Sequence, residues 1–273
     1  MRTLSEILGF VVFAMYGASS AAYLRHFFQP DAAVGAYKRT LFRATLALHA
    51  AYLAVGWAAA GHMPLYNRFA ILAVVVFAYS LIYLVVETRT GQAEVGGFIL
   101  ALATIFFGVS LFSFGQPVEL DARFQGPMFA FHISTVILAY SALFLGFLFA
   151  GLYLLLYYEI KEHRLGRIYQ RLPPLELLAT MSNHANILGF GFLTVGIVAG
   201  SLWAKQVWDL YFGLDPKLIA TAAVWLIYGA GVLAARLPGW SRKRSAYVSV
   251  LGFFTLVFSF VLLHSVVVSQ HNF

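Results

Sequence analysis

Residues 129–157 read FAFHISTVILAYSALFLGFLFAGLYLLLY and contain no Asp, Glu, Lys or Arg. A helix needs about 20 apolar residues to cross the hydrocarbon core of a bilayer, so this stretch predicts a transmembrane helix with residues to spare. Hydrophobic segments of similar character lie on both sides of it, at 5–24, 41–60, 68–87, 94–113, 186–204, 217–235 and 246–268. The sequence therefore predicts an all-α polytopic integral membrane protein with about eight transmembrane helices.

The composition of the 273-residue chain excludes an ordinary soluble protein. Hydrophobic residues make up 61% of it and charged residues 11%, whereas soluble domains carry about 25% charged residues. Because the chain has no cysteine, disulfides, thiolate metal sites and thioether attachment of a cofactor are excluded. No internal repeat or soluble domain is visible in the sequence. We therefore expect one transmembrane domain over residues 1–273, with the first segment retained as a helix.

The basic residues are divided unevenly between the two sides that eight crossings define. One side holds five of the 18 cations and the other holds 13. The larger group is Arg25, Lys38, Arg39, Arg43, Arg89, Lys161, Arg164, Arg167, Arg171, Arg236, Arg242, Lys243 and Arg244. Short loops rich in Lys and Arg stay in the cytoplasm, so both termini are predicted to face the outer side. This topology accounts for the net charge of +7 without nucleic-acid binding.

The predicted topology places the histidines at different depths. His132 and His264 lie near the outer ends of the fifth and eighth segments, and His62 lies in a short outer turn. His49 lies well inside the second segment, and His184 near the cytoplasmic start of the sixth. Ionisable side chains at membrane depth mark functional sites by default. His49 is therefore a candidate for ligand binding.

The sixth segment leads into a predicted outer loop, at about 200–217, that is rich in aromatic residues. Its aromatic side chains are Trp203, Trp208, Tyr211 and Phe212. One interpretation is an interfacial aromatic belt, with Asp215 as N-cap of the next helix and Pro216 in its first turn. The other is a hydrophobic platform on which a flat ligand stacks between two outer imidazoles. The residues alone leave both interpretations open.

The glycines that precede this loop suggest close helix packing. Gly196 and Gly200 have small-xxx-small spacing, and Gly189 and Gly191 lie one to two turns earlier. No phosphate-binding loop or metalloprotease motif is present, and ATP hydrolysis is excluded.

The segment 200–217, followed by Trp225-Leu226-Ile227-Tyr228, resembles the tryptophan-rich WWD signature of haem-handling proteins. That superfamily comprises the CcsA/ResC cytochrome c assembly proteins and their CcmC and CcmF relatives. Further motifs of the family have counterparts here: Phe131-His132-Ile133-Ser134 with Tyr140-Ser141-Ala142, Gly61-His62-Met63-Pro64-Leu65-Tyr66-Asn67, Gly189-Phe190 with Leu193-Thr194-Val195-Gly196, and His264-Ser265. The resemblance runs from about residue 40 to the end.

The resemblance implies that His132 and His264 ligate the iron of non-covalently bound haem b at the outer face. Two neutral imidazoles on separate helices can fill both axial positions of a haem iron, so the residues themselves favour the same pair. The candidate haem-binding residues are His132, His264, Trp203, Trp208, Tyr211, Phe212, Asp215, His49 and His62.

Several positions depart from the family signature. Its second and third tryptophans correspond to Phe212 and Leu214, and its Glu after Pro-Lys to Leu218. A transmembrane histidine of the assembly proteins falls on Ala234, and an acidic residue after the Gly-His-Phe-Pro turn falls on Ala70. With these departures the sequence resembles the HemX-like branch of the superfamily, whose role is haem-related.

The predicted function is to hold haem at the outer face of a bacterial cytoplasmic membrane for delivery or attachment to apocytochrome c. The resemblance implies a ResB/CcsB-like membrane partner. The alternative is a HemX-like regulator or assembly factor that attaches haem to nothing, and a third is a transporter or quinone-interacting subunit without haem. Whether the chain forms part of an enzyme is left open.

Two interpretations also remain open for His49. Its neutral imidazole either forms a hydrogen bond with a neighbouring helix or serves as an inner haem ligand, with His184 as a conceivable partner.

Overall fold

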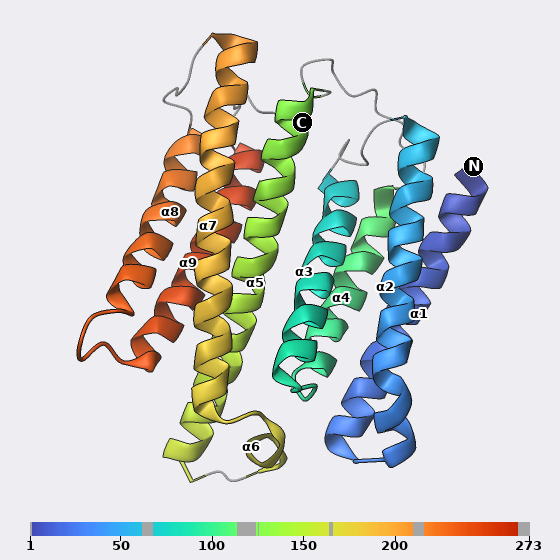
Figure 1. The fold of residues 1–273 in the computed structure, drawn as a ribbon, viewed down its shortest axis with the longest axis vertical. Helices are drawn as coiled ribbons and strands as arrows, with labels where there is room; N and C mark the ends of the chain where they lie inside the picture. The colour runs from blue at the N-terminus through green and yellow to red at the C-terminus, as the bar shows by residue number, and fades with distance from the viewer. Residues whose placement is uncertain are drawn as a thin grey trace. The chain divides into compact units, whose positions relative to one another are not determined.

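The computed structural model describes residues 2–61, 68–113, 124, 126–163, 166–209 and 216–266. Within these ranges the chain forms helices joined by turns, and no strand occurs (Figure 1). The helices are α1 (Arg2–Phe28), α2 (Ala32–Ala60), α3 (Arg68–Thr90), α4 (Gly96–Ser110), the 3₁₀ helix η1 (Leu111–Ser113), α5 (Pro127–Lys161), α6 (Arg167–Arg171), α7 (Leu175–Trp208), α8 (Pro216–Ala234) and α9 (Arg242–Val266). The predicted all-α fold is confirmed, and each predicted segment corresponds to one helix.

Five helices in the described part of the chain are long and apolar enough to cross a membrane. They are α1, α2, α3, α5 and α7, and two shorter apolar helices are α4 and α8. At about 1.5 Å per residue, the 35 residues of α5 span roughly 50 Å, against a hydrocarbon core of about 30 Å. The protein is a multi-pass membrane protein in which α5 and α7 extend beyond the apolar layer.

Two helices begin well before the positions that hydropathy predicts. The predicted segments start at 41 and 186, whereas α2 starts at Ala32 and α7 at Leu175. Asp31 caps α2, because its Oδ1 accepts hydrogen bonds from the backbone N–H groups of Ala33 and Val34 at 2.9 and 3.4 Å. The early turns carry charged residues, which lower hydropathy without interrupting a helix.

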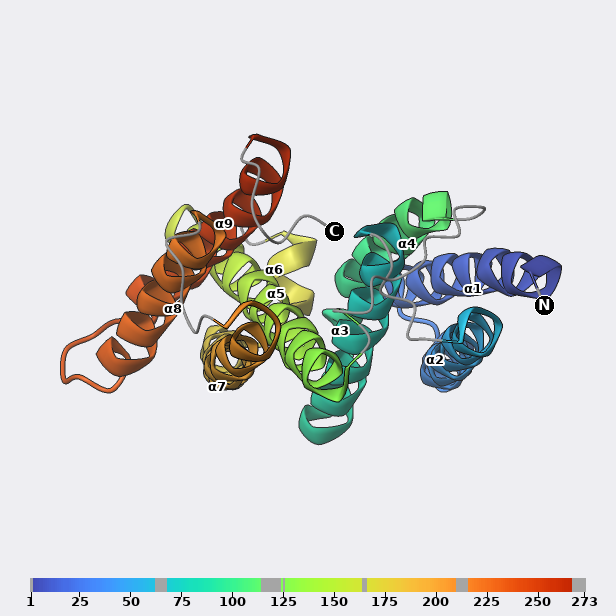
Figure 2. The same cartoon turned by 90° about the horizontal axis from the view of Figure 1, so that it is seen from above.

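The helices group into two compact units, which we describe separately. Unit 1 comprises residues 1–120 and 165–173, and unit 2 comprises residues 121–164 and 174–273. In unit 1, α1 packs against α2 and α4, and α3 packs against α4 and α2. In unit 2, α5 packs against α7 and α9, and α8 packs against α9 and α7 (Figures 1 and 2). That the chain forms a single domain stays a prediction.

The helix order defines two opposite ends of unit 2. The start of α5, the end of α7, the start of α8 and the end of α9 share one end, which is the upper one in Figure 1. We call it the His132 end. The opposite end holds the end of α5 and the starts of α7 and α9, and we call it the Arg242 end. The cations Arg236, Arg242, Lys243 and Arg244 all belong to this second end.

The orientation of the chain in the membrane is predicted from its charges and is testable with reporter fusions. A fusion at residue 273 is expected to report an extracytoplasmic location, and one inserted within 162–171 a cytoplasmic location. Alkaline phosphatase and green fluorescent protein fusions measure the two locations independently. A cytoplasmic signal from the C-terminal fusion would reverse the orientation and move His132 to the inner face.

Candidate functional site

His132 lies in the second turn of α5, at the His132 end of unit 2. Its Nδ1 is 2.8 Å from the carbonyl oxygen of Gly196 in α7. Because a carbonyl oxygen only accepts hydrogen bonds, Nδ1 carries the proton and donates this bond. The neutral ring then has its lone pair on Nε2. Metal-ligating histidines commonly donate their other ring N–H to a backbone carbonyl, so this imidazole has the tautomer that a ligand through Nε2 requires.

Glycines of α7 allow that helix to approach α5 closely. A Cβ atom on Gly200 would lie 2.6 Å from Cε1 of His132. Cβ atoms on Gly189 and Gly196 would lie 2.6 and 3.1 Å from side chains of α5. The predicted role in close helix packing is confirmed at these three positions, whereas a Cβ atom on Gly191 would meet nothing within 4 Å.

Trp203, which lies on α7 like Gly196, packs its indole ring against the imidazole of His132. The two rings are stacked, with centroids 6.0 Å apart and planes 14° apart. Phe129 and Phe124 pack on Trp203, with centroid distances of 5.1 and 5.6 Å. Trp203 is only 3% exposed, so it forms a buried wall behind the histidine. The indole thus holds the imidazole in place.

The start of the predicted outer loop is helical. Residues 200–208 belong to α7, which ends at Asp209 with a left-handed backbone conformation (φ 56°). Lys205 forms an ion pair with Asp209, four residues later. A cation in the last turn of a helix also interacts favourably with the helix dipole. Helical structure is the reason that Trp203 faces α5 and its phenylalanines.

An apolar cavity of about 730 Å³ lies between the start of α5 and the last turns of α7. Trp203 contributes to its wall, together with Pro127, Phe131, Val195, Val198 and Leu202. Cofactor sites are usually concave, mostly apolar and about 300–1,000 Å³ in volume. The cavity is therefore of a size and character that suit the apolar body of a porphyrin.

The remaining outer candidates fall partly outside the described structure. His264 lies on the last turns of α9 and Trp208 is the last residue of α7, so both belong to the His132 end, but their side chains are not described. His62, Tyr211, Phe212 and Asp215 lie outside the described residues. The structure thus brings together His132 and Trp203 and places the backbone of residue 264 at the same end.

His49 is fully buried within unit 1, in a box of aromatic rings. Its Nδ1 is 3.0 Å from the hydroxyl of Tyr16 in α1, and the ring of Phe107 lies 4.7 Å away, centroid to centroid, at 75°. Nε2 is buried and has no hydrogen-bond partner among the described residues. This geometry includes the hydrogen bond to a neighbouring helix that one interpretation requires. The role of His49 as an inner haem ligand stays a prediction, as does its pairing with His184, which belongs to unit 2.

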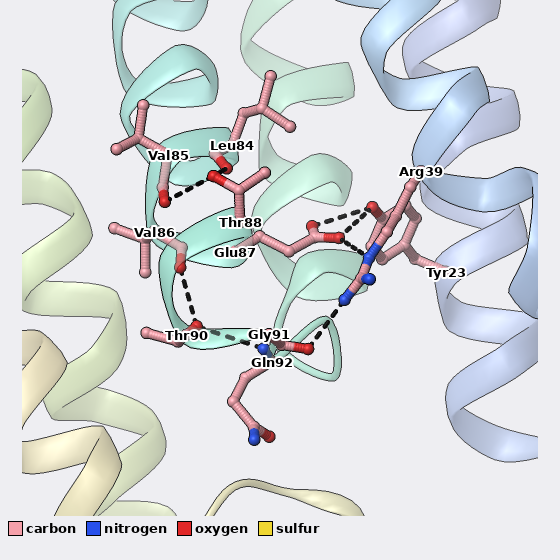
Figure 3. Close-up of polar contacts among 10 residues, drawn as sticks. All are labelled: Tyr23, Arg39, Leu84, Val85, Val86, Glu87, Thr88, Thr90, Gly91 and Gln92. Atoms are coloured by element: carbon pink, nitrogen blue, oxygen red, sulfur yellow. Dashed lines mark hydrogen bonds and ion pairs between the residues drawn. The ribbon is translucent and has the colours of Figure 1, made fainter.

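A second polar cluster in unit 1 was not identified from the sequence (Figure 3). Glu87 is 1% exposed, and both of its carboxylate oxygens accept the Tyr23 hydroxyl at 2.9 Å. Arg39 donates its Nε–H to Oε1 of Glu87 at 2.8 Å and its NH2 group to the carbonyl oxygen of Gly91 at 2.8 Å. Three helices are thereby joined through one buried carboxylate. An acidic residue at the end of an apolar segment was the signal that could have found it.

The described residues contain no group of three or more His, Asp or Glu side chains that could hold a metal ion by themselves. A haem iron needs only one or two protein ligands, because the porphyrin supplies four nitrogens. The fold and the site therefore define a multi-pass helical membrane protein in which an oriented histidine packs against a tryptophan that lines an apolar cavity.

Comparisons with known proteins identify the family. The chain belongs to the family described as Cytochrome C assembly protein, which matches residues 64–269. It is 29% identical to the cytochrome c biogenesis protein CcsA of Guillardia theta, over 74% of this chain and 73% of that protein. It is 26% identical to CcsA of Parasynechococcus marenigrum, over 81% of each.

A solved structure shares the fold. The chain resembles a cytochrome c haem lyase, CcmF, with a TM-score of 0.66 and 17% identity, over 95% of this chain. The chain spans 46% of the length of that protein.

Proposed function

We propose that this protein binds haem b non-covalently at the His132 end of unit 2 and holds it for delivery or attachment to apocytochrome c. The observation that carries the proposal is the hydrogen bond from His132 Nδ1 to the Gly196 carbonyl, which fixes the tautomer with its lone pair on Nε2. Membership of the cytochrome c assembly family supports it. The names of the relatives, cytochrome c biogenesis proteins and a haem lyase, support the same role.

In this proposal each residue of the site has a separate task. His132 of α5 and His264 on the last turns of α9 would hold the haem iron through their imidazoles. Trp203 packs against the imidazole of His132, and the apolar cavity that Trp203 helps to line would accept the macrocycle. Trp208, Tyr211 and Phe212 would stack on the porphyrin, and Asp215 and His62 remain candidates for contacts with haem. When bound, haem supplies the vinyl groups that form thioether bonds with a Cys-x-x-Cys-His segment of the apocytochrome.

The resemblance to CcsA-type proteins suggests a ResB/CcsB-like membrane partner and a place in the bacterial cytoplasmic membrane. The alternative function is that of a HemX-like regulator or assembly factor. The observation that favours this alternative is the loss of signature tryptophans at Phe212 and Leu214.

Reconstitution separates the two functions. The protein is expressed with its membrane partner, purified in detergent, tested for a Soret band and then mixed with reduced apocytochrome c. We expect haem to co-purify and to become covalently attached to the apocytochrome. Bound haem without attachment would favour the regulator, and a protein that never binds haem would contradict both.

A further inference from the structure

A second cavity lies at the Arg242 end of unit 2, at the opposite end from His132. Its volume is about 190 Å³, and it is bounded by α5, by the first half of α7, by Ala235 just past the end of α8 and by the first turns of α9. By the predicted orientation this end meets the cytoplasmic surface of the membrane. The cavity is independent of the site proposed for haem.

The lining of this cavity is polar for a membrane protein. It includes the side chains of Thr180, Asn183, Asn186, Trp240, Arg242 and Ser245. The deeper part is ordered by hydrogen bonds: Ser249 donates to Oδ1 of Asn186 at 3.1 Å, and the indole N–H of Trp240 donates to Ser245 at 2.9 Å. Polar groups that converge inside a bundle mark a site for a polar ligand.

Arg242 gives the cavity its charge. It forms an ion pair with Glu176 of α7, and its side chain remains 60% exposed. A guanidinium group has five N–H donors, so this pair leaves donors for another oxyanion. Lys243 and Arg244 follow Arg242 in the first turn of α9 and add positive charge beside the cavity.

Aromatic rings hold two of these cations at the surface. Lys243 Nζ lies 4.8 Å from the ring centroid of Tyr157 and 5.2 Å from that of Tyr158. Arg244 lies 5.7 Å from the ring of Trp240. Tyr and Trp with Lys and Arg are typical of the level of lipid headgroups.

We propose that this cavity binds the phosphate group of an anionic phospholipid headgroup, with Arg242 as the charged contact. Basic pockets between transmembrane helices on the cytoplasmic side bind such headgroups, and the negative surface of that leaflet concentrates them. Asn183, Thr180 and Ser245 offer hydrogen bonds to the phosphate and to a polar headgroup. Leu233 and Leu237, two residues before and after Ala235 in the sequence, are 65% and 62% exposed and offer apolar surface to acyl chains at this end of unit 2.

The test uses the full chain in nanodiscs of phosphatidylglycerol and phosphatidylcholine, with native mass spectrometry to count retained lipids. We expect the wild-type protein to retain phosphatidylglycerol preferentially and to melt at a higher temperature in its presence. Arg242→Gln is expected to lower this retention by about tenfold or more, because a charge-assisted hydrogen bond to the phosphate is lost. Arg236→Gln removes the same charge at the same end of unit 2, from a residue that does not line the cavity, so this variant should retain the lipid.

Each outcome decides part of the proposal. Equal retention of the two lipids, or equal losses in the two arginine variants, would overturn it. A parallel titration with inorganic phosphate identifies the source of the ligand. An Arg242-dependent rise in melting temperature with phosphate, without preference for phosphatidylglycerol, would support the phosphate site and overturn the lipid as its source. Both arginine side chains are exposed, so the variants are expected to fold.

Discussion

Replacing His132 with alanine is expected to lower the haem that co-purifies with the protein by at least about tenfold. Loss of a group that forms a hydrogen bond with a metal-ligating side chain costs about 10–100-fold in metal affinity. Loss of the ligating side chain itself should cost no less. The haem-to-protein ratio after detergent purification measures the effect, and added imidazole should restore part of it. Haem iron held by two imidazoles is expected to be low-spin. Loss of one imidazole should therefore change the absorption spectrum of the haem that remains.

Gly200→Ala tests the position of the imidazole rather than its presence. The new Cβ atom would lie 2.6 Å from Cε1 of His132, so the ring must move away from its bond to Gly196. Alanine is also a better helix former than glycine, by about 1 kcal/mol, and this gain protects the fold while the site is disturbed. We expect a lower haem-to-protein ratio in a protein that folds.

Gly191→Ala is the matched control for Gly200→Ala. It makes the same substitution in the same helix, at a position where the new Cβ atom meets nothing within 4 Å. It should leave haem binding unchanged. If both glycine variants and His132→Ala kept the wild-type ratio and spectrum, the assignment of His132 as a haem ligand would be wrong.

Replacing Glu87 with alanine is expected to lower the free energy of unfolding by about 2–3 kcal/mol. Breaking a buried ion pair costs about 3–5 kcal/mol, but Arg39 is 44% exposed and regains part of its hydration. The Tyr23 hydroxyl also loses both of its acceptor oxygens in the buried cluster of unit 1 (Figure 3). Thermal or denaturant unfolding of the purified protein measures the loss.

Glu176→Ala is the matched control, because Glu176 also pairs with an arginine but is 72% exposed. An exposed pair is worth about 0–1 kcal/mol, so this variant should unfold almost as the wild type does. Equal stability of the two glutamate variants would show that the Glu87 cluster does not hold unit 1 together.

The sequence was sufficient to predict the long helices, because a membrane imposes a minimum length of apolar residues on each. It was less informative about where they begin. Hydropathy reports the part of a helix inside the apolar layer, whereas Asp31 and the cations after it extend α2 into the polar region. The same effect explains the early start of α7, whose first turn contains Glu176.

The sequence predicted the depth in the membrane of residues at the candidate site. It did not predict the direction in which each side chain points around its helix. His132 and Trp203 were assigned to the same outer level, and their rings stack on each other. The burial of Trp203 could not be predicted, because it depends on which face of α7 meets α5. Glu87 was missed because hydropathy treats a carboxylate as the end of a segment, whatever partners it finds on other helices.

The acceptor of the His132 hydrogen bond is a backbone carbonyl, and this has a consequence for genetic studies. Every amino acid at position 196 carries that oxygen, so an alanine scan of α7 would not delete the group that orients the imidazole. In a saturation library the contact would register as intolerance of bulk at positions 196 and 200, with little dependence on polarity. Such a size-dependent profile on one face of α7 would report the imidazole orientation in living cells, before any haem is measured.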